Sequence, residues 1–237
     1  MRLIGLKTVG LSLLLMGGLV QGRMLPEEAV DPVKSIVLED FSATPAGSFP
    51  RGWKTRKPEH YREAALGKYQ VVDLPEGKAV RARGGETKIA IYRDLKGFEW
   101  NLDTHPYLEW RWKVTRLPEG ANEKEHSRND AAATVFLVWK APWPHQADTV
   151  RYSWSSTLPV GTEFTRRFKR DDIIIVESGA DHLNAWRTVR IHIPRLYREK
   201  IGKRKPVPPV AIALRTDSNS THSPAEAYYG TIRICQE

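Results

Sequence analysis

The stretch Tyr107-Leu108-Glu109-Trp110-Arg111-Trp112-Lys113-Val114 decides the fold class. In an extended chain its four alternate apolar residues share one face, and Glu109, Arg111 and Lys113 share the other. A helix would scatter both sets around its axis. The stretch therefore predicts a β-strand whose apolar face, with both tryptophans, packs in a core.

Similar runs recur along the chain, separated by Gly, Pro, Asn and Asp. They predict strands over residues 36–41, 69–74, 79–83, 88–94, 132–139, 150–154, 172–177, 188–193, 210–216 and 227–234. Residues 133–139 and 172–176 are apolar on both faces, which indicates central strands. Only residues 195–202, between Pro194 and a glycine, predict a short helix. Many short strands at this spacing indicate an all-β sandwich or barrel.

The amino end has the order of a secretory signal peptide. Arg2 and Lys7 precede an apolar run over residues 9–20, and small residues follow at 21–22. The run has about 12 residues, fewer than the roughly 20 that cross a bilayer, although an uncleaved anchor is the alternative. We expect a signal peptide at 1–22, a tail at 23–35, one domain at 36–237 and a periplasmic location.

The net charge of the chain limits the classes of partner that we expect it to bind. The full sequence carries a net charge of +9, and removal of residues 1–22 would leave 215 residues with +7. A basic exported protein favours anionic polysaccharide, lipopolysaccharide or phospholipid headgroups, and nucleic acid is not expected. Cys235 is the only cysteine, so neither an intramolecular disulfide nor a cysteine metal site is expected.

Common catalytic and cofactor motifs are missing from the sequence. It contains no G-x-S-x-G, no H-E-x-x-H, no phosphate-binding glycine loop and no C-x-x-C. Its seven histidines are scattered singly. Residues 215–221 are rich in oxygen ligands, but they include one carboxylate and match no spaced calcium motif. No metal and no cofactor are therefore expected.

Aromatic residues are the first group of candidate ligand-binding residues. Trp143, between Pro142 and Pro144, is a candidate exposed platform for a sugar ring. Tyr152 and Trp154 alternate with Arg151 and Ser153, and either pair could face the core. Both aromatic residues therefore remain candidates.

Charged residues form the second group. Arg111 lies on the polar face of its strand, which is either a ligand surface or a solvated face. Glu177, Arg215 and Asp217 follow apolar runs, where loops often carry function but where burial also simply stops. The basic triplet at residues 203–205 is either a solvated loop or a headgroup contact.

Several blocks together resemble a family of exported bacterial proteins catalogued as domain of unknown function 3047. The blocks are residues 38–42, 108–114, 129–132, 152–154, 158–161, 176–179, 186–187, 211–217 and 227–230. The resemblance implies a jelly-roll sandwich akin to carbohydrate-binding modules. It also implies that Asp130, Glu177, Asp217 and Arg111 lie near one another. The relatives have a more acidic loop where this chain has Ser218-Asn219-Ser220. This difference weakens the prediction of a metal site in the loop.

Three hypotheses follow. The first is a non-catalytic β-sandwich that binds glycan or another anionic polymer of the cell envelope. The second is a polysaccharide lyase or glycoside hydrolase that pairs Glu177 with Asp130 or Asp217. The third is an envelope assembly or lipid-contact factor that uses residues 203–205 at a membrane surface.

Overall fold

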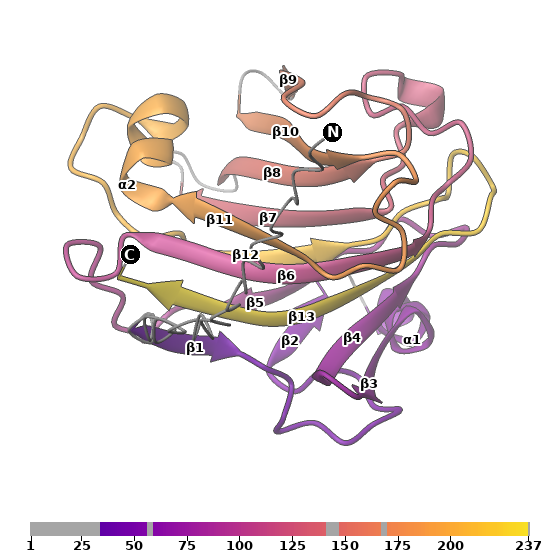
Figure 1. Ribbon diagram of the computed structural model, residues 1–237, viewed down its shortest axis with the longest axis horizontal. Helices are drawn as coiled ribbons and strands as arrows, with labels where there is room; N and C mark the ends of the chain where they lie inside the picture. The colour runs from indigo at the N-terminus through magenta and orange to yellow at the C-terminus, as the bar shows by residue number, and fades with distance from the viewer. Residues whose placement is uncertain (1–33, 56–58, 141–146, 167–169, 237) are drawn as a thin grey trace, which may run out of the picture. The chain divides into compact units, whose positions relative to one another are not determined.

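Two β-sheets make up most of the computed structural model, which describes residues 34–55, 59–140, 147–166 and 170–236 (Figure 1). Sheet A has the order β11-β6-β13-β4-β3, and β1 also pairs with β13. Its strands are β1 (Ser35–Glu39), β3 (Tyr69–Leu74), β4 (Gly77–Arg83), β6 (Tyr107–Arg116), β11 (Arg187–His192) and β13 (Glu226–Cys235).

Sheet B has the order β2-β5-β12-β7-β8-β10-β9. Its strands are β2 (Trp53–Thr55), β5 (Ile91–Asp94), β7 (Ala133–Lys140), β8 (Ala147–Ser155), β9 (Glu163–Arg166), β10 (Asp171–Ser178) and β12 (Ala211–Arg215). The β8–β10 pair is parallel, whereas the other described pairs are antiparallel. The chain passes repeatedly between the sheets, and the predicted all-β, jelly-roll-like sandwich is confirmed.

An aromatic core joins the inner faces of the two sheets. The ring of Trp110 lies 5.4 Å from that of Tyr152, and Trp112 lies 6.2 Å from Trp154, measured between centroids. All four side chains are buried. Because successive side chains in a strand point to opposite faces, Arg111 lies on the outer face of sheet A and Arg151 on that of sheet B.

The helices differ more from the sequence-based expectation than the strands do. The helix expected at 195–202 begins earlier, as α2 (Ile193–Leu196) followed by a π-helical turn, η2 (Tyr197–Ile201). The sequence did not predict α1 (Glu59–Lys68), the 3-10 turn η1 (His126–Arg128), β2 or β9. Helix α1 has a single large aliphatic residue, Leu66, so no periodic apolar stripe indicates it.

The predicted signal peptide at 1–22, and all but the last two residues of the predicted tail at 23–35, lie outside the described residues. Within the described ranges, no helix is long and apolar enough to cross a membrane. Cys235 is buried and not in a disulfide.

Candidate functional site

A group of buried charged side chains lies on and beside the outer face of sheet B. We call it the buried charge cluster, and its members are Lys88, Glu123, Asp130, Arg151, Asp171, Arg215 and Asp217. Five of the seven residues, all except Lys88 and Arg151, are at most 9% exposed. Charged groups are rarely buried unless they are paired, since transfer out of water is costly. So dense a group needs a structural or functional reason.

Two arginines flank the ring of Phe136 on the central strand of sheet B. Arg151 of β8 lies directly opposite Phe136 of β7, with its guanidinium carbon 4.9 Å from the ring centroid. The guanidinium carbon of Arg215, at the end of β12, lies 5.1 Å from the same ring. Arg151 also forms an ion pair with Asp171 at the start of β10. Burial, reinforced by the positive charge of Arg215, lowers the pKa of Arg151 to about 10.

Asp217, near the end of β12, has two positively charged side chains close to its carboxylate. Its Oδ2 atom lies 2.9 Å from Nζ of Lys88 and 3.5 Å from Nε of Arg215, and its side chain is fully buried. Burial lowers the pKa of Lys88, as does Arg215, and Asp217 opposes this shift. Arg215 therefore connects the Phe136 end of the cluster with its Asp217 end.

Asp130 holds the loop that follows β12. Its carboxylate accepts hydrogen bonds from the backbone NH of Ser220 (3.0 Å), the backbone NH of Thr221 (2.7 Å) and Oγ1 of Thr221 (2.9 Å). In addition, the backbone NH of Asp217 donates to the carbonyl of Ala131 at 3.0 Å. Asp130 is thus a positioning residue, which fixes the segment that carries Asp217.

Glu123 attaches its loop to sheet B beside the cluster. Ser155 Oγ, at the end of β8, donates to its Oε2 atom at 2.6 Å. Burial raises the pKa of Glu123, and this hydrogen bond, Arg215 and Arg166 act against the rise. The guanidinium of Arg166 on β9 donates to the backbone carbonyl of Glu123, so the loop is attached to two strands of sheet B.

Several polar atoms of the cluster lack a hydrogen-bond partner among the described residues. They are Glu123 Oε1, Arg151 Nε, Asp171 Oδ1, Arg215 Nε and Asp217 Oδ1, and all are buried. An unpaired buried polar group costs about 1–3 kcal/mol relative to a paired one. The cluster therefore keeps both donors and acceptors whose hydrogen-bonding capacity is not used by the fold.

The aromatic candidates have different positions. Tyr152 (3% exposed) and Trp154 (0%) belong to the core between the sheets, so their prediction as ligand-binding residues is corrected. The reason is that their face of β8 meets Trp110 and Trp112, whereas Arg151 and Ser153 take the outer face. Trp143 lies outside the described residues.

The charged candidates divide into three places. Asp130, Arg215 and Asp217 come together in the buried charge cluster. Arg111 lies on sheet A, where Nη2 donates to the carbonyl of Glu76 at 2.7 Å. Glu177 lies in a third place, where its carboxylate contacts two other side chains. Its Oε1 atom accepts a hydrogen bond from Nε of Arg187 at 3.1 Å, and its Oε2 atom lies 2.8 Å from Nδ1 of His182. The contacts of Arg111 and Glu177 involve no member of the cluster.

Four cluster members were not among the sequence candidates: Lys88, Glu123, Arg151 and Asp171. One signal was present, because Arg151 and Ser153 alternate with two aromatic residues and had to face away from whichever side those rings took. Across the described part of the chain, no group of three or more His, Cys, Asp or Glu side chains is arranged to hold a metal ion.

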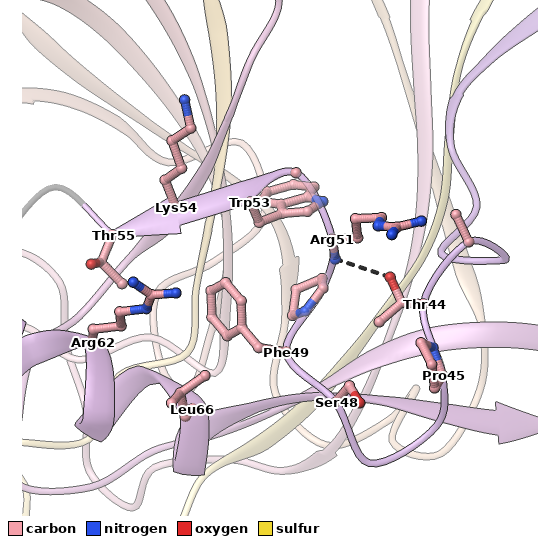
Figure 2. A pocket seen from close by; sticks show the side chains of 13 residues that line it. Thr44, Pro45, Ser48, Phe49, Arg51, Trp53, Lys54, Thr55, Arg62 and Leu66 are labelled. Atoms are coloured by element: carbon pink, nitrogen blue, oxygen red, sulfur yellow. Dashed lines mark hydrogen bonds between the residues drawn. The ribbon is translucent and has the colours of Figure 1, made fainter.

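A pocket of about 790 Å³ lies apart from all of these residues, between β2 and α1 (Figure 2). Among the described residues, its wall includes Arg51, Lys54 and Arg62 together with Phe49 and Leu66, and no carboxylate. None of the sequence-predicted candidates within the described residues lines it.

Fold and site together define a two-sheet β-sandwich with a charged outer face on one sheet. A family model described as "Protein of unknown function (DUF3047)" matches residues 51–233, so the chain belongs to that family, as its sequence blocks indicated. No functionally curated protein matches the chain significantly.

Solved structures with a similar fold include two carbohydrate-binding modules. One is the family 11 module of the cellulosomal cellulase Lic26A-Cel5E of Clostridium thermocellum, with 12% identity, a TM-score of 0.45, and coverage of 87% of this chain and 96% of the module. The other is the CBM22-1 xylan-binding domain of Paenibacillus barcinonensis Xyn10C, with 10% identity, a TM-score of 0.37, and coverage of 87% and 99%.

Proposed function

We propose that this protein is exported and binds a polysaccharide, or another anionic polymer of the cell envelope, through the outer face of sheet B. The observation that carries the proposal is the buried charge cluster around Phe136 and Arg215, with its unpaired donors and acceptors. Groups of this kind gain most from a ligand rich in hydroxyls, because each hydroxyl both donates and accepts.

The arrangement of the cluster fits binding by preorganised groups. Arg151 is held by Asp171 and by the ring of Phe136, and Arg215 is held by the same ring and by Asp217. Side chains that are already fixed lose little conformational entropy when a ligand arrives. The net charge of +7 that remains after removal of residues 1–22 adds a general attraction to anionic polymers.

Export is supported by the sequence of residues 1–22, with Arg2 and Lys7 before an apolar run. Cell fractionation followed by mass spectrometry of the mature amino terminus tests this part. We expect a periplasmic protein that lacks about the first 22 residues, by the usual order of signal regions. A full-length cytoplasmic protein would contradict it.

Two observations favour binding over a glycosidic cleavage reaction in which Glu177 acts together with Asp130 or Asp217. The carboxylate of Glu177 is engaged by Arg187 and His182, and that of Asp130 is engaged by three hydrogen bonds from the 220–221 segment. Carboxylates with such internal partners are poor candidates for an acid and a base that must both reach one glycosidic bond.

Calorimetric titration with soluble peptidoglycan fragments, lipopolysaccharide and acidic polysaccharide tests the proposed function. We expect binding to at least one polymer, and a loss of affinity of about tenfold in Arg215→Gln, which removes a charge-assisted hydrogen bond. Lys88→Gln gives the same test at a more exposed position, where the side chain is 37% accessible. Arg195→Gln and Lys203→Gln are matched controls on exposed segments.

Two outcomes would count against the proposal. One is a folded wild-type protein that binds none of the polymers at low salt. The other is equal weakening by the cluster variants and by the controls, which would indicate a general charge effect. Release of reducing ends or unsaturated products in the same titrations would favour the enzymatic alternative.

A further inference from the structure

The outer face of sheet A carries a second, separate group of side chains. We call Arg111, Lys113, Trp186 and Tyr228 the cation–aromatic patch. It extends over β6, β13 and the residue before β11, three strands that lie side by side in sheet A (Figure 1). The guanidinium carbon of Arg111 lies 4.6 Å from the Trp186 ring, and Nζ of Lys113 lies 5.1 Å from the rings of both Trp186 and Tyr228.

The patch is built into the strand beneath it. A Cβ atom at Gly230 of β13 would lie 2.7 Å from Nε and 2.8 Å from Cγ of Arg111, and 3.1 Å from Cζ3 of Trp186. Only glycine therefore lets Arg111 and Trp186 lie this close to the backbone. The hydrogen bond from Arg111 to the carbonyl of Glu76 fixes the guanidinium further. Arg111 and Trp186 are therefore held in place without a ligand.

The charge of the patch is not compensated by the protein. Elsewhere on sheet A, Arg83 pairs with Glu226 and Arg233 pairs with Glu109. Among the described residues, by contrast, no carboxylate lies within ion-pair distance of Arg111 or Lys113. Nε of Arg111 and Nε1 of Trp186 are also buried and have no hydrogen-bond partner within the described ranges. Two cations and two aromatic rings, half-buried, thus share one site with unused donors.

We propose that the cation–aromatic patch binds the acidic sugar units of a polysaccharide, with a uronate carboxylate at Arg111 and Lys113 and the sugar ring beside Tyr228 and Trp186. Carboxylate recognition by arginine is strong and directional, and aromatic side chains offer an apolar surface with a polar edge. The inference rests on the proposed function for its saccharide ligand. It adds the charge of that ligand and a site on the opposite sheet.

An acidic saccharide fits the patch better than a membrane does. Binding in a membrane interface relies on apolar side chains that enter the lipid. The large exposed apolar residues of the described chain are Ile36, Val37, Leu66, Phe98, Val160 and Val207. None of them belongs to β4, β6, β11 or β13, the strands around the patch.

Titration with a galacturonate hexasaccharide, and with a neutral glucose hexasaccharide of equal length, tests the inference. We expect the wild type to prefer the galacturonate, and Arg111→Gln/Lys113→Gln to lose at least about tenfold of that affinity through loss of charge-assisted hydrogen bonds. Lys203→Gln/Arg204→Gln removes the same residue types from an exposed loop and should bind as the wild type does. Lys88→Gln, in the buried charge cluster, reports on the proposed function and not on the patch.

The outcomes separate the two proposals. If Arg111→Gln/Lys113→Gln binds galacturonate as the wild type does, the patch inference is wrong, and a loss in Lys88→Gln would leave the proposed function in place. If the wild type binds neither hexasaccharide, the patch inference is wrong, and the titrations with peptidoglycan fragments and lipopolysaccharide then decide the proposed function. Binding to phosphatidylglycerol vesicles that the double variant loses, without galacturonate binding, would overturn the inference in favour of a lipid surface. Lys113→Gln alone serves if the double variant fails to fold by circular dichroism.

Discussion

Tyr229→Phe should destabilise the fold at the point where Arg215 is anchored. The hydroxyl of Tyr229 is buried between the sheets, donates to the carbonyl of Arg215 at 2.6 Å and accepts from the backbone NH of Thr134 at 3.1 Å. Oγ1 of Thr216 lies 3.1 Å from it as well. Burial raises the pKa of Tyr229, so the hydroxyl stays protonated and available as a donor at any physiological pH.

The expected loss of stability follows from the partners left behind. Each buried polar group without a partner costs about 1–3 kcal/mol, so two such groups should lower the free energy of unfolding by about 2–6 kcal/mol. For a chain of this size, this corresponds to a fall in Tm of roughly 4–24 °C. Urea denaturation should show a lower midpoint with an unchanged slope.

Tyr152→Phe is the matched control for this prediction. Tyr152 is also buried, but its hydroxyl makes no hydrogen bond to a described residue. Its removal should change the free energy of unfolding by less than about 0.5 kcal/mol, as for substitutions that touch no buried interaction. If both variants lose the same stability, or Tyr229→Phe loses none, the hydroxyl of Tyr229 does not have the anchoring role inferred above.

Three further predictions concern the loops around the cluster. Burial raises the pKa of Glu123, so the folded state holds this proton to higher pH; the wild type should lose stability relative to Glu123→Gln as pH rises above about 4.5, measured by denaturation at several pH values. A difference that is independent of pH would contradict this. Asp130→Ala removes three loop hydrogen bonds and should cost about 2–3 kcal/mol, with faster proteolysis at residues 218–222; native-like protease resistance would refute the positioning role. A Cβ atom at Gly84 would lie 2.2 Å from Oγ of Ser218, so Gly84→Ala should cost about 1–3 kcal/mol in thermal unfolding, and Gly85→Ala, with open space, almost nothing.

The strands could be predicted because their side chains follow a period of two. Trp110 and Trp112, on the apolar face of residues 107–114, are buried in the core as expected, and the run at 133–139 is the central strand β7. The short strands β2 and β9 were missed because three or four residues show no clear period.

The site could be predicted only in part. Arg215 and Asp217 could be predicted because they lie at and just after the end of a buried strand, and Asp130 because it lies in a block that resembles the family. Lys88 and Glu123 lie in loops, and their neighbours are set by how distant loops meet rather than by local spacing. The side taken by Arg151 depended on which face of β8 meets sheet A, which one strand cannot reveal.

Strand β13 has a consequence for the order in which the protein can assemble. It is the last strand in the sequence, yet it pairs with β1, β4 and β6. As the chain is synthesised, these three strands have no common neighbour until residues 226–235 appear, whereas every strand of sheet B has by then been made. Sheet A therefore closes last, and a truncation before residue 226 would leave the edge of β6, the strand of Trp110 and Trp112, without its β13 partner and prone to aggregation.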